Sequence, residues 1–204
     1  MTQYLNVVSQ EIINDSINDY NSRNMYDTTT MNKAGVGSSL ELFTPIIERI
    51  LDKQLVYKSG NFYKHSAPYL PHTDYKTYHN NTINVVIPLM YTGSQASLII
   101  FDQEWEQDSV TWCMQHSVMY FSTNIGVKGY PREYPITNKT GKSIDETLYN
   151  QYLSHYPKHG LLELSGTAYL FEPGSMIIFN NKKIHCTSKM NGEKLGISLR
   201  YSII

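Results

Sequence analysis

The sequence predicts a mainly β protein, a sandwich or barrel with helices packed against one side. Two patterns lead to this class. From residue 54 onward, short segments rich in Val, Ile, Tyr and Phe alternate with Gly, Pro and Asn, as is typical of a sandwich or barrel. Before residue 54, apolar residues recur at helical spacing instead. A helical front followed by a run of strands indicates sheets with helices buttressing one face.

Two helices are expected in the first 53 residues. Between Tyr4 and Tyr20, apolar residues at three- and four-residue steps form one stripe, which predicts an amphipathic helix. Residues 21–39 are rich in Asn, Thr, Ser and Gly and predict a loop. Thr44 followed by Pro45 is typical of a helix start, which predicts a second helix from there through residue 51.

Eight strands are expected after the helices, each a run of β-branched and aromatic residues between turn signals. They cover residues 55–58, 61–65, 82–91, 97–101, 110–120, 168–171, 175–179 and 194–203. Between residues 122 and 165 the chain is irregular and rich in Gly and Pro, with a short helix expected near 144–156. A long segment of this kind indicates a lid-like insert before the last strands.

The composition indicates an ordered globular chain. Of its 204 residues, 41% are hydrophobic and 12% aromatic, which supplies apolar surface to offset the entropy of folding. This length suits a single domain, with helical support over 1–53 and a β core over 54–204. The 17 basic and 18 acidic residues give a net charge of -1 without a long run of either sign, so no clear nucleic-acid footprint is visible.

The cysteines and the N-terminus bear on location. Cys113 and Cys186 show no Cys-x-x-Cys spacing, which disfavours a disulfide framework and favours a reducing compartment. The first residues show no basic stretch followed by an apolar one, and no apolar run approaches the ~20 residues that span a bilayer. We therefore expect a soluble, cytoplasmic protein without a membrane partner.

The sequence His72-Thr73-Asp74 is the first chemical motif. Because residues i and i+2 of an extended strand share a face, His72 and Asp74 point to the same side. A second imidazole is expected from His185, which follows a buried strand and a turn at 180–183. Two histidines and one carboxylate on one face of an iron leave the opposite face open for a co-substrate and oxygen. The pattern therefore predicts a non-haem Fe(II) site.

The last expected strand carries the second motif. Its alternate residues Ile197, Leu199 and Tyr201 form an apolar face that is expected to pack outward on the N-terminal helices. The other face presents Arg200 and Ser202 to the interior, where an always-charged guanidinium needs an anion. A guanidinium with a neighbouring hydroxyl suits recognition of a carboxylate.

The order of these fragments resembles the Fe(II)- and 2-oxoglutarate-dependent dioxygenases. The lead-in to His185 through Pro173-Gly174 is similar to that family as well. The resemblance covers residues 57–204 and implies a double-stranded β-helix, or jelly-roll, core. It further implies that His72, Asp74 and His185 bind Fe(II), and that the activity is hydroxylation of a small-molecule or peptide substrate with release of succinate and CO2.

The resemblance also implies contacts to 2-oxoglutarate. Arg200 would pair with its distal carboxylate, and Ser202 would assist. Tyr63, on the strand before the metal pair, would add a hydroxyl to the same carboxylate, and Asn84 would line the cofactor wall. The histidines that flank the metal pair, His65 and His79, could line the mouth of the site, but surface positions are favoured.

Two other functions remain open. A cupin-like module could bind a metal or another ligand on the same strands without redox activity, although a His-x-His pair would suit it better than the motif at 72–74. An iron oxygenase that does not use 2-oxoglutarate would leave Arg200 and Ser202 unexplained. Halogenation is disfavoured because family halogenases lack the carboxylate that Asp74 supplies. The sequence predicts no particular substrate.

Overall fold

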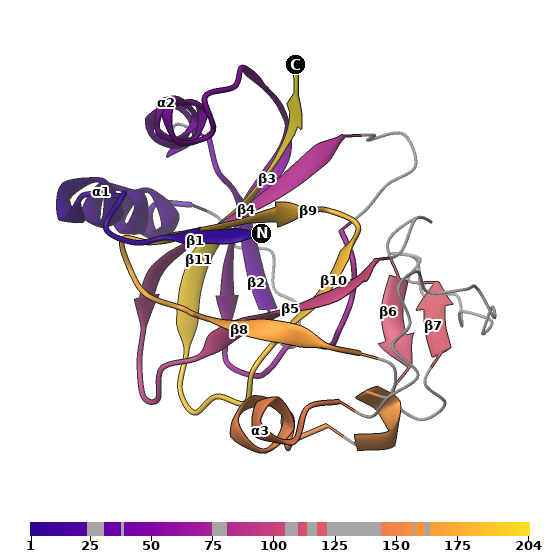
Figure 1. The fold of residues 1–204 in the computed structure, drawn as a ribbon. Helices are drawn as coiled ribbons and strands as arrows, with labels where there is room; N and C mark the ends of the chain where they lie inside the picture. Colours follow the sequence, from indigo (N-terminus) through magenta and orange to yellow (C-terminus); the bar gives the residue numbers. More distant parts are fainter. Residues whose placement is uncertain are drawn as a thin grey trace.

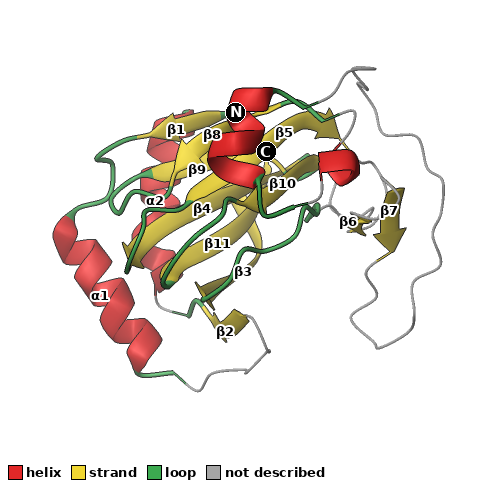
Figure 2. Ribbon diagram, turned by 90° about the horizontal axis from the view of Figure 1, so that it is seen from below, coloured by secondary structure: helices red, strands yellow, loops and turns green. Residues whose placement is uncertain are grey.

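The computed structural model describes residues 1–23, 31–37, 39–74, 81–104, 110–113, 118–121, 144–156, 158–161 and 164–204. Within these ranges the chain forms antiparallel sheets, with two long helices packed on the outside of the largest sheet (Figures 1 and 2). The fold is thus mainly β with N-terminal helical support, as the sequence predicts.

The largest sheet has six strands, and its order along the sheet does not follow the sequence. Across the sheet lie β1 (Thr2–Tyr4), β9 (Met176–Asn180), β4 (Thr82–Tyr91), β11 (Lys194–Ile203), β3 (Leu55–His65) and β2 (Met31–Gly35). Strand β11 lies between β3 and β4 and pairs with both over nearly its full length. One face of β11 therefore reaches the interior across the middle of the sheet.

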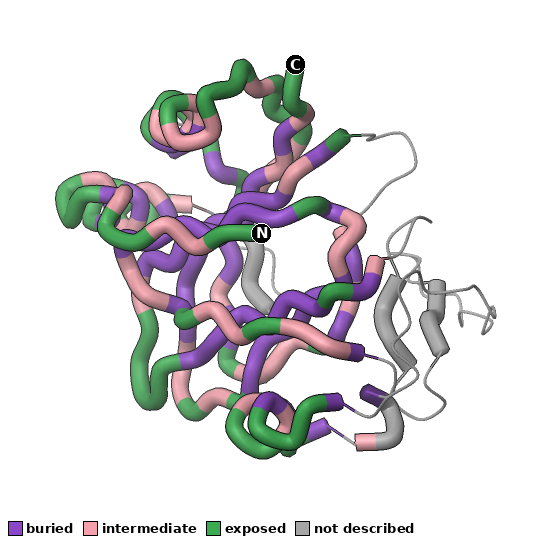
Figure 3. Tube along the Cα trace, in the orientation of Figure 1, coloured by how far each residue is buried: buried purple, intermediate pink, exposed green. Residues whose placement is uncertain are grey.

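A second sheet packs against the inner face of the first. It contains β10 (Lys183–Thr187), β5 (Ser97–Glu104) and β8 (Gly166–Leu170), while β6 (Val110–Cys113) and β7 (Val118–Phe121) pair with each other. Buried residues from both sheets, including Val86, Ile100 and Phe179, meet in a common core. Figure 3 shows this buried interior along the facing strands. The two sheets form the jelly roll that contains the site.

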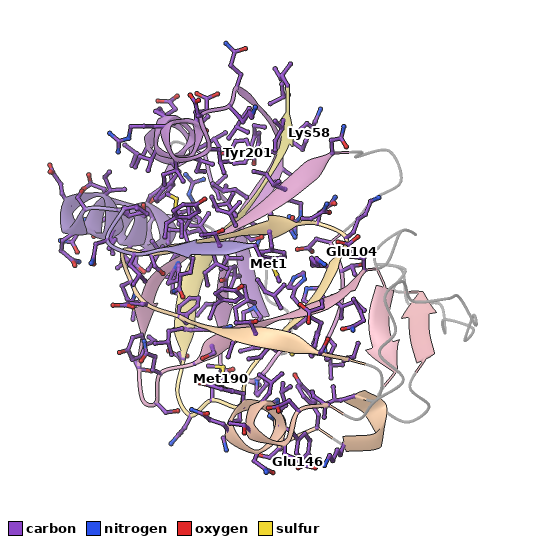
Figure 4. All side chains as sticks on the ribbon, viewed as in Figure 1. Met1, Lys58, Glu104, Glu146, Met190 and Tyr201 are labelled. Carbon is purple, nitrogen blue, oxygen red and sulfur yellow. The ribbon has the colours of Figure 1, made fainter. Side chains whose placement is uncertain are left out.

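The helices cover the outer face of the six-stranded sheet. Helix α1 (Gln10–Asn21) begins at Ser9, whose side chain accepts a hydrogen bond from the Ile12 amide. Helix α2 (Ser39–Leu51) buries Phe43 and Ile47 in a core shared with the sheet. Tyr201, labelled in Figure 4, extends from β11 toward α2, where its hydroxyl lies 2.9 Å from that of Thr44. The outward face of the last strand is confirmed.

Helix α2 begins at Ser39, five residues before the start that Thr44 and Pro45 predict. Proline removes only one helical hydrogen bond, and the burial of Phe43 and Ile47 on either side of Pro45 outweighs that loss. The Thr44 hydroxyl bonds to the Leu40 carbonyl inside the helix and does not cap it.

Several strands also differ from expectation. Strand β3 runs through Gly60, because this glycine allows close contact with β11: a Cβ there would lie 2.6 Å from Leu199 Cδ2. Strands β1 and β2 lie where no strand is expected, and two short strands replace the one expected over 110–120. Such short strands depend on non-local pairing more than on local pattern.

The expected insert is only partly described. Residues 122–143 lie outside the described ranges. Beyond them, the helix expected near 144–156 consists of α3 (Glu146–Leu148) and a π-helical turn η1 (Tyr149–Leu153). A short 3-10 turn η2 (Lys158–Leu161) comes after it. Leu148 and Leu153 pack with Ile99 and Ile184 on the outer face of the second sheet. In the described part of the chain, no helix is long and apolar enough to cross a membrane.

Candidate metal centre

The main chain brings two histidines together. His72 and His185 form an isolated antiparallel bridge, in which the His72 amide donates to the His185 carbonyl at 2.9 Å and the His185 amide donates back at 2.8 Å. Their ring centroids are 4.2 Å apart. His185 lies on β10, so the bridge ties the segment that follows β3 to the second sheet. The sequence predicts this pair, and the structure shows that backbone pairing creates it.

Asp74 completes a triad with these histidines. The three potential ligand atoms all lie within 4.8 Å of one another. Asp74 Oδ2 is 3.5 Å from His185 Nε2. The Nδ1 atoms of His72 and His185 lie 2.8 and 3.0 Å from the carbonyls of Leu70 and Lys183. A proton on each Nδ1 would satisfy those carbonyls and leave Nε2 free as a metal ligand, so the donor set fits a divalent transition metal.

The protonation states suit metal binding. Desolvation in the pocket, and then the proximity of His185, lower the pKa of His72 to about 3, so its imidazole is neutral near pH 7. Burial alone would raise the pKa of Asp74, but the positive charge of Arg200, followed by the contact with His185, holds it well below the ordinary value. The pocket therefore presents a neutral imidazole and an ionised carboxylate.

The residue expected to pair with 2-oxoglutarate and the one expected on the cofactor wall both contact Asp74. Arg200 Nη2 lies 2.8 Å from Asp74 Oδ1, and the Asn84 amide donates to Asp74 Oδ2 at 3.0 Å. Arg200 and Asn84 are direct partners in the pairing of β11 with β4, so the two strands deliver them to one place. The sequence pattern brings these residues to the site but does not reveal that they meet the carboxylate.

A cavity of about 110 Å³ opens beside the triad. Its wall includes Asn61, Tyr63, His65, Tyr69 and Ser198, together with the triad and Arg200. Burial, and then the charge of Asp74, raise the pKa of Tyr63, so its phenol is neutral. Among the described residues, Ser202 is not part of this wall; it pairs with Val56 and Thr82 farther along β11.

His65 is buried and lines the cavity, so the favoured surface position is wrong and the alternative place beside the site holds, while His79 is outside the described ranges. The His65 side chain packs edge-on against Tyr63 and Tyr69, with centroid separations of 5.0 and 5.5 Å. The expectation for His65 rests only on its position in the sequence near His72 and Asp74. However, Tyr63 and His65 are two residues apart on β3, so strand alternation places both on the interior face.

Lys194 is the charged residue at this cavity that the sequence reasoning misses. It is only 3% exposed, and its Nζ donates to Thr187 Oγ1 at 2.9 Å. The Nζ also lies 5.1 and 5.9 Å from the ring centroids of Phe171 and Tyr63. Burial lowers the pKa of Lys194 to about 7. Period-two alternation along β11 puts Lys194 on the same face as Ser198 and Arg200, so extending that pattern to the first residue of the strand would have found it.

Comparisons with known proteins agree with this architecture. No protein-family model matches the sequence, and no curated protein matches it. Among solved structures, HygX from Streptomyces hygroscopicus with nickel and 2-oxoglutarate bound is similar over 98% of this chain and 81% of its own, with 12% identity and a TM-score of 0.54.

Two further solved structures share the fold. The epimerase SnoN in complex with Fe3+, alpha ketoglutarate and nogalamycin RO has 9% identity and a TM-score of 0.56, covering 98% of this chain and 78% of its own. EctD from S. alaskensis in its apoform has 12% identity and a TM-score of 0.51, covering 98% and 72%. At these identities the likeness shows the fold: the chain has the jelly-roll architecture of the 2-oxoglutarate-dependent non-haem oxygenases.

Proposed function

We propose that the protein is an Fe(II)/2-oxoglutarate-dependent oxygenase that hydroxylates a small-molecule or peptide substrate, with release of succinate and CO2. The observation that carries this proposal is the triad of His72, Asp74 and His185 beside a cavity that also contains a buried lysine. The fold supports it, because similar solved structures contain a metal with 2-oxoglutarate at 9–12% identity.

His72, Asp74 and His185 would hold the iron. When bound, ferrous iron with 2-oxoglutarate supplies the oxidising chemistry that a substrate C–H bond requires. The chain supplies the ligand geometry and a cavity lined partly by buried side chains that exclude water. Tyr69 packs edge-on against His72 at 4.6 Å, and Phe179 packs against His185 at 4.9 Å, so each imidazole is held in orientation by an aromatic neighbour.

We propose that Lys194 is the main counter-ion for the far carboxylate of 2-oxoglutarate. Its contacts are a hydroxyl and two aromatic rings, and no carboxylate in the described part of the chain forms an ion pair with it. Arg200, by contrast, already pairs with Asp74. Lys194 and Arg200 are six residues apart on β11, so their Cα atoms are about 20 Å apart at ~3.3 Å per residue. The two side chains therefore serve different ends of the site.

The remaining residues have supporting roles in this proposal. The Thr187 hydroxyl and the neutral Tyr63 phenol lie beside Lys194 and offer hydrogen bonds to the same carboxylate. The alternative is that Arg200, with Ser202, binds this carboxylate and Asn84 lines the cofactor wall. That arrangement requires Arg200 to leave Asp74 first.

The experiment is an anaerobic titration followed by turnover. The purified protein is loaded with Fe(II), titrated with 2-oxoglutarate and then exposed to oxygen, and succinate is measured. We expect iron-dependent succinate, at least a tenfold weaker affinity for 2-oxoglutarate in Lys194→Gln, and no affinity change in Lys64→Gln, whose ammonium pairs with Glu193 on the surface. Failure of 2-oxoglutarate to bind the iron-loaded protein would sink the proposal. Tight zinc binding with unchanged ligand binding in Lys194→Gln would favour the cupin-like alternative.

A further inference from the structure

Asp74 is held in place mainly by contacts to its carboxylate and not by backbone pairing. His72 belongs to a backbone bridge, whereas Asp74 lies beyond that bridge in a segment without regular secondary structure. Its carboxylate is contacted from two sides, by Arg200 at Oδ1 and by Asn84 at Oδ2. Asn84 is fully buried, and the Asp74 and Arg200 side chains are 19% and 18% exposed, so solvent competes little for these contacts.

These contacts leave the two carboxylate oxygens in different states. Oδ1 is engaged by a guanidinium, which is a charge-assisted contact. Oδ2 accepts one hydrogen bond from Asn84 and otherwise faces His185 Nε2 at 3.5 Å. A cation held between the two imidazoles would therefore meet Oδ2, and it could use both oxygens only if Arg200 moved away.

We propose that Arg200 and Asn84 are positioning residues that restrict Asp74 to single-oxygen coordination, and that this restriction sets the centre's preference among divalent cations. The proposal rests on the proposed function, because it assumes that Asp74 is a metal ligand. A transition metal held by two histidines and one carboxylate takes one ligand atom from each of the three residues and keeps its other positions open. Ca²⁺ prefers more oxygen ligands and often takes both oxygens of a carboxylate. The clamp should therefore discriminate against Ca²⁺.

The test measures the ratio of Mn²⁺ to Ca²⁺ affinities, without 2-oxoglutarate or substrate. Loss of the positive charge of Arg200 should strengthen the binding of both cations. The affinity for one metal alone would therefore not separate the effect of charge from that of geometry, whereas the ratio of the two affinities does. Wild type, Arg200→Gln and Arg200→Lys are titrated with Mn²⁺ by electron paramagnetic resonance, with Ca²⁺ as competitor. Lys194→Gln is the matched control, because it removes a cation of the same strand and cavity that contacts Thr187, not Asp74.

We expect the Mn²⁺ preference to fall about tenfold in Arg200→Gln, to take an intermediate value in Arg200→Lys, and to keep its wild-type value in Lys194→Gln. An unchanged ratio in Arg200→Gln would overturn the clamp. If that variant does not fold, a wild-type ratio in Arg200→Lys would overturn it as well. Mn²⁺ binding that does not depend on Asp74, shown with Asp74→Asn, would instead overturn the proposed function, so the two failures are distinguishable.

Discussion

His72 and His185 exchange two backbone hydrogen bonds, of 2.9 and 2.8 Å, although they lie far apart in the sequence. The imidazoles therefore stand side by side because their main chains are paired. A cation that binds between them links the segment after β3 to β10, so metal binding should stabilise the native state.

We expect saturating Mn²⁺ to raise the Tm of the wild-type protein. A ligand at 100 times its Kd stabilises the native state by about 2.7 kcal/mol, provided that it does not bind the unfolded chain. His185→Ala removes one of the three ligands and should abolish this shift. His155→Ala is the control, because His155 stacks on Tyr156 outside the triad. Calorimetry with and without EDTA measures the effect, and an undiminished shift in His185→Ala would contradict the metal assignment.

The affinity for 2-oxoglutarate should fall as pH rises above 7. Burial lowers the pKa of Lys194 to about 7, so its amine is increasingly neutral above that pH, while an anion needs the ammonium form. The neighbouring groups stay neutral, since burial raises the pKa of both Cys186 and Tyr63. The decline should approach tenfold per pH unit.

Calorimetric titration of 2-oxoglutarate into the Mn²⁺-loaded protein between pH 6 and 9 tests this dependence. Lys194→Arg supplies the control, because a guanidinium stays charged throughout this range and should give a flat profile. A flat profile in the wild-type protein would show that Lys194 is not the counter-ion.

Replacing Lys194 by Met should stabilise the protein, and more so at low pH. The folded pKa, about 7, lies below the unfolded value of 10.5, so the unfolded chain binds more protons between these values. The cost of burying this amine is therefore complete below pH 7 and disappears as pH rises toward 10.5. Urea unfolding at pH 6 should show a gain on the order of a few kcal/mol that shrinks by pH 9.5. A gain that does not depend on pH would mean that the folded pKa is not depressed.

Gly60→Ala should destabilise the fold. A methyl group there would lie 2.6 Å from Leu199 Cδ2 and 3.0 Å from the Ser198 carbonyl, so the buried Leu199 side chain would have to repack and the β11 backbone to shift slightly. Overpacking of this kind costs about 1–3 kcal/mol. Gly35→Ala is the matched control, because a Cβ at Gly35 meets no atom within 4 Å. Equal free energies of unfolding for the two variants in urea would show that the contact at Gly60 relaxes freely.

The sequence predicts best what depends on local periodicity. The bounds of β4 and β11 match their expected ranges, because both are long strands with a regular pattern. Strand β2 could not be found in this way, since Met31–Gly35 is defined by its pairing with β3 and lies in a stretch with no strand pattern of its own.

At the site, the motif residues could be predicted but not their partners. His72, Asp74 and His185 meet as expected. Nothing local to Arg200 indicates that its nearest anion is Asp74, because that contact depends on where the segment after the His72 bridge lies. Strand alternation could have indicated Lys194, but its low exposure arises from packing against Phe171, which follows β8, and Thr187 on β10.

The position of β11 also bears on how the protein folds. Because β3 and β4 pair with β11 and not with each other, the six-stranded sheet consists of two separate halves until β11 inserts between them. These pairings join distant parts of the sequence, and such contacts form slowly. Lys194 and Arg200 arrive with this strand, so we expect the cavity to acquire its positive charges in the same late step that closes the sheet. If His72 and His185 pair before β11 inserts, the site at that stage lacks both the partner of Asp74 and the proposed counter-ion of the co-substrate.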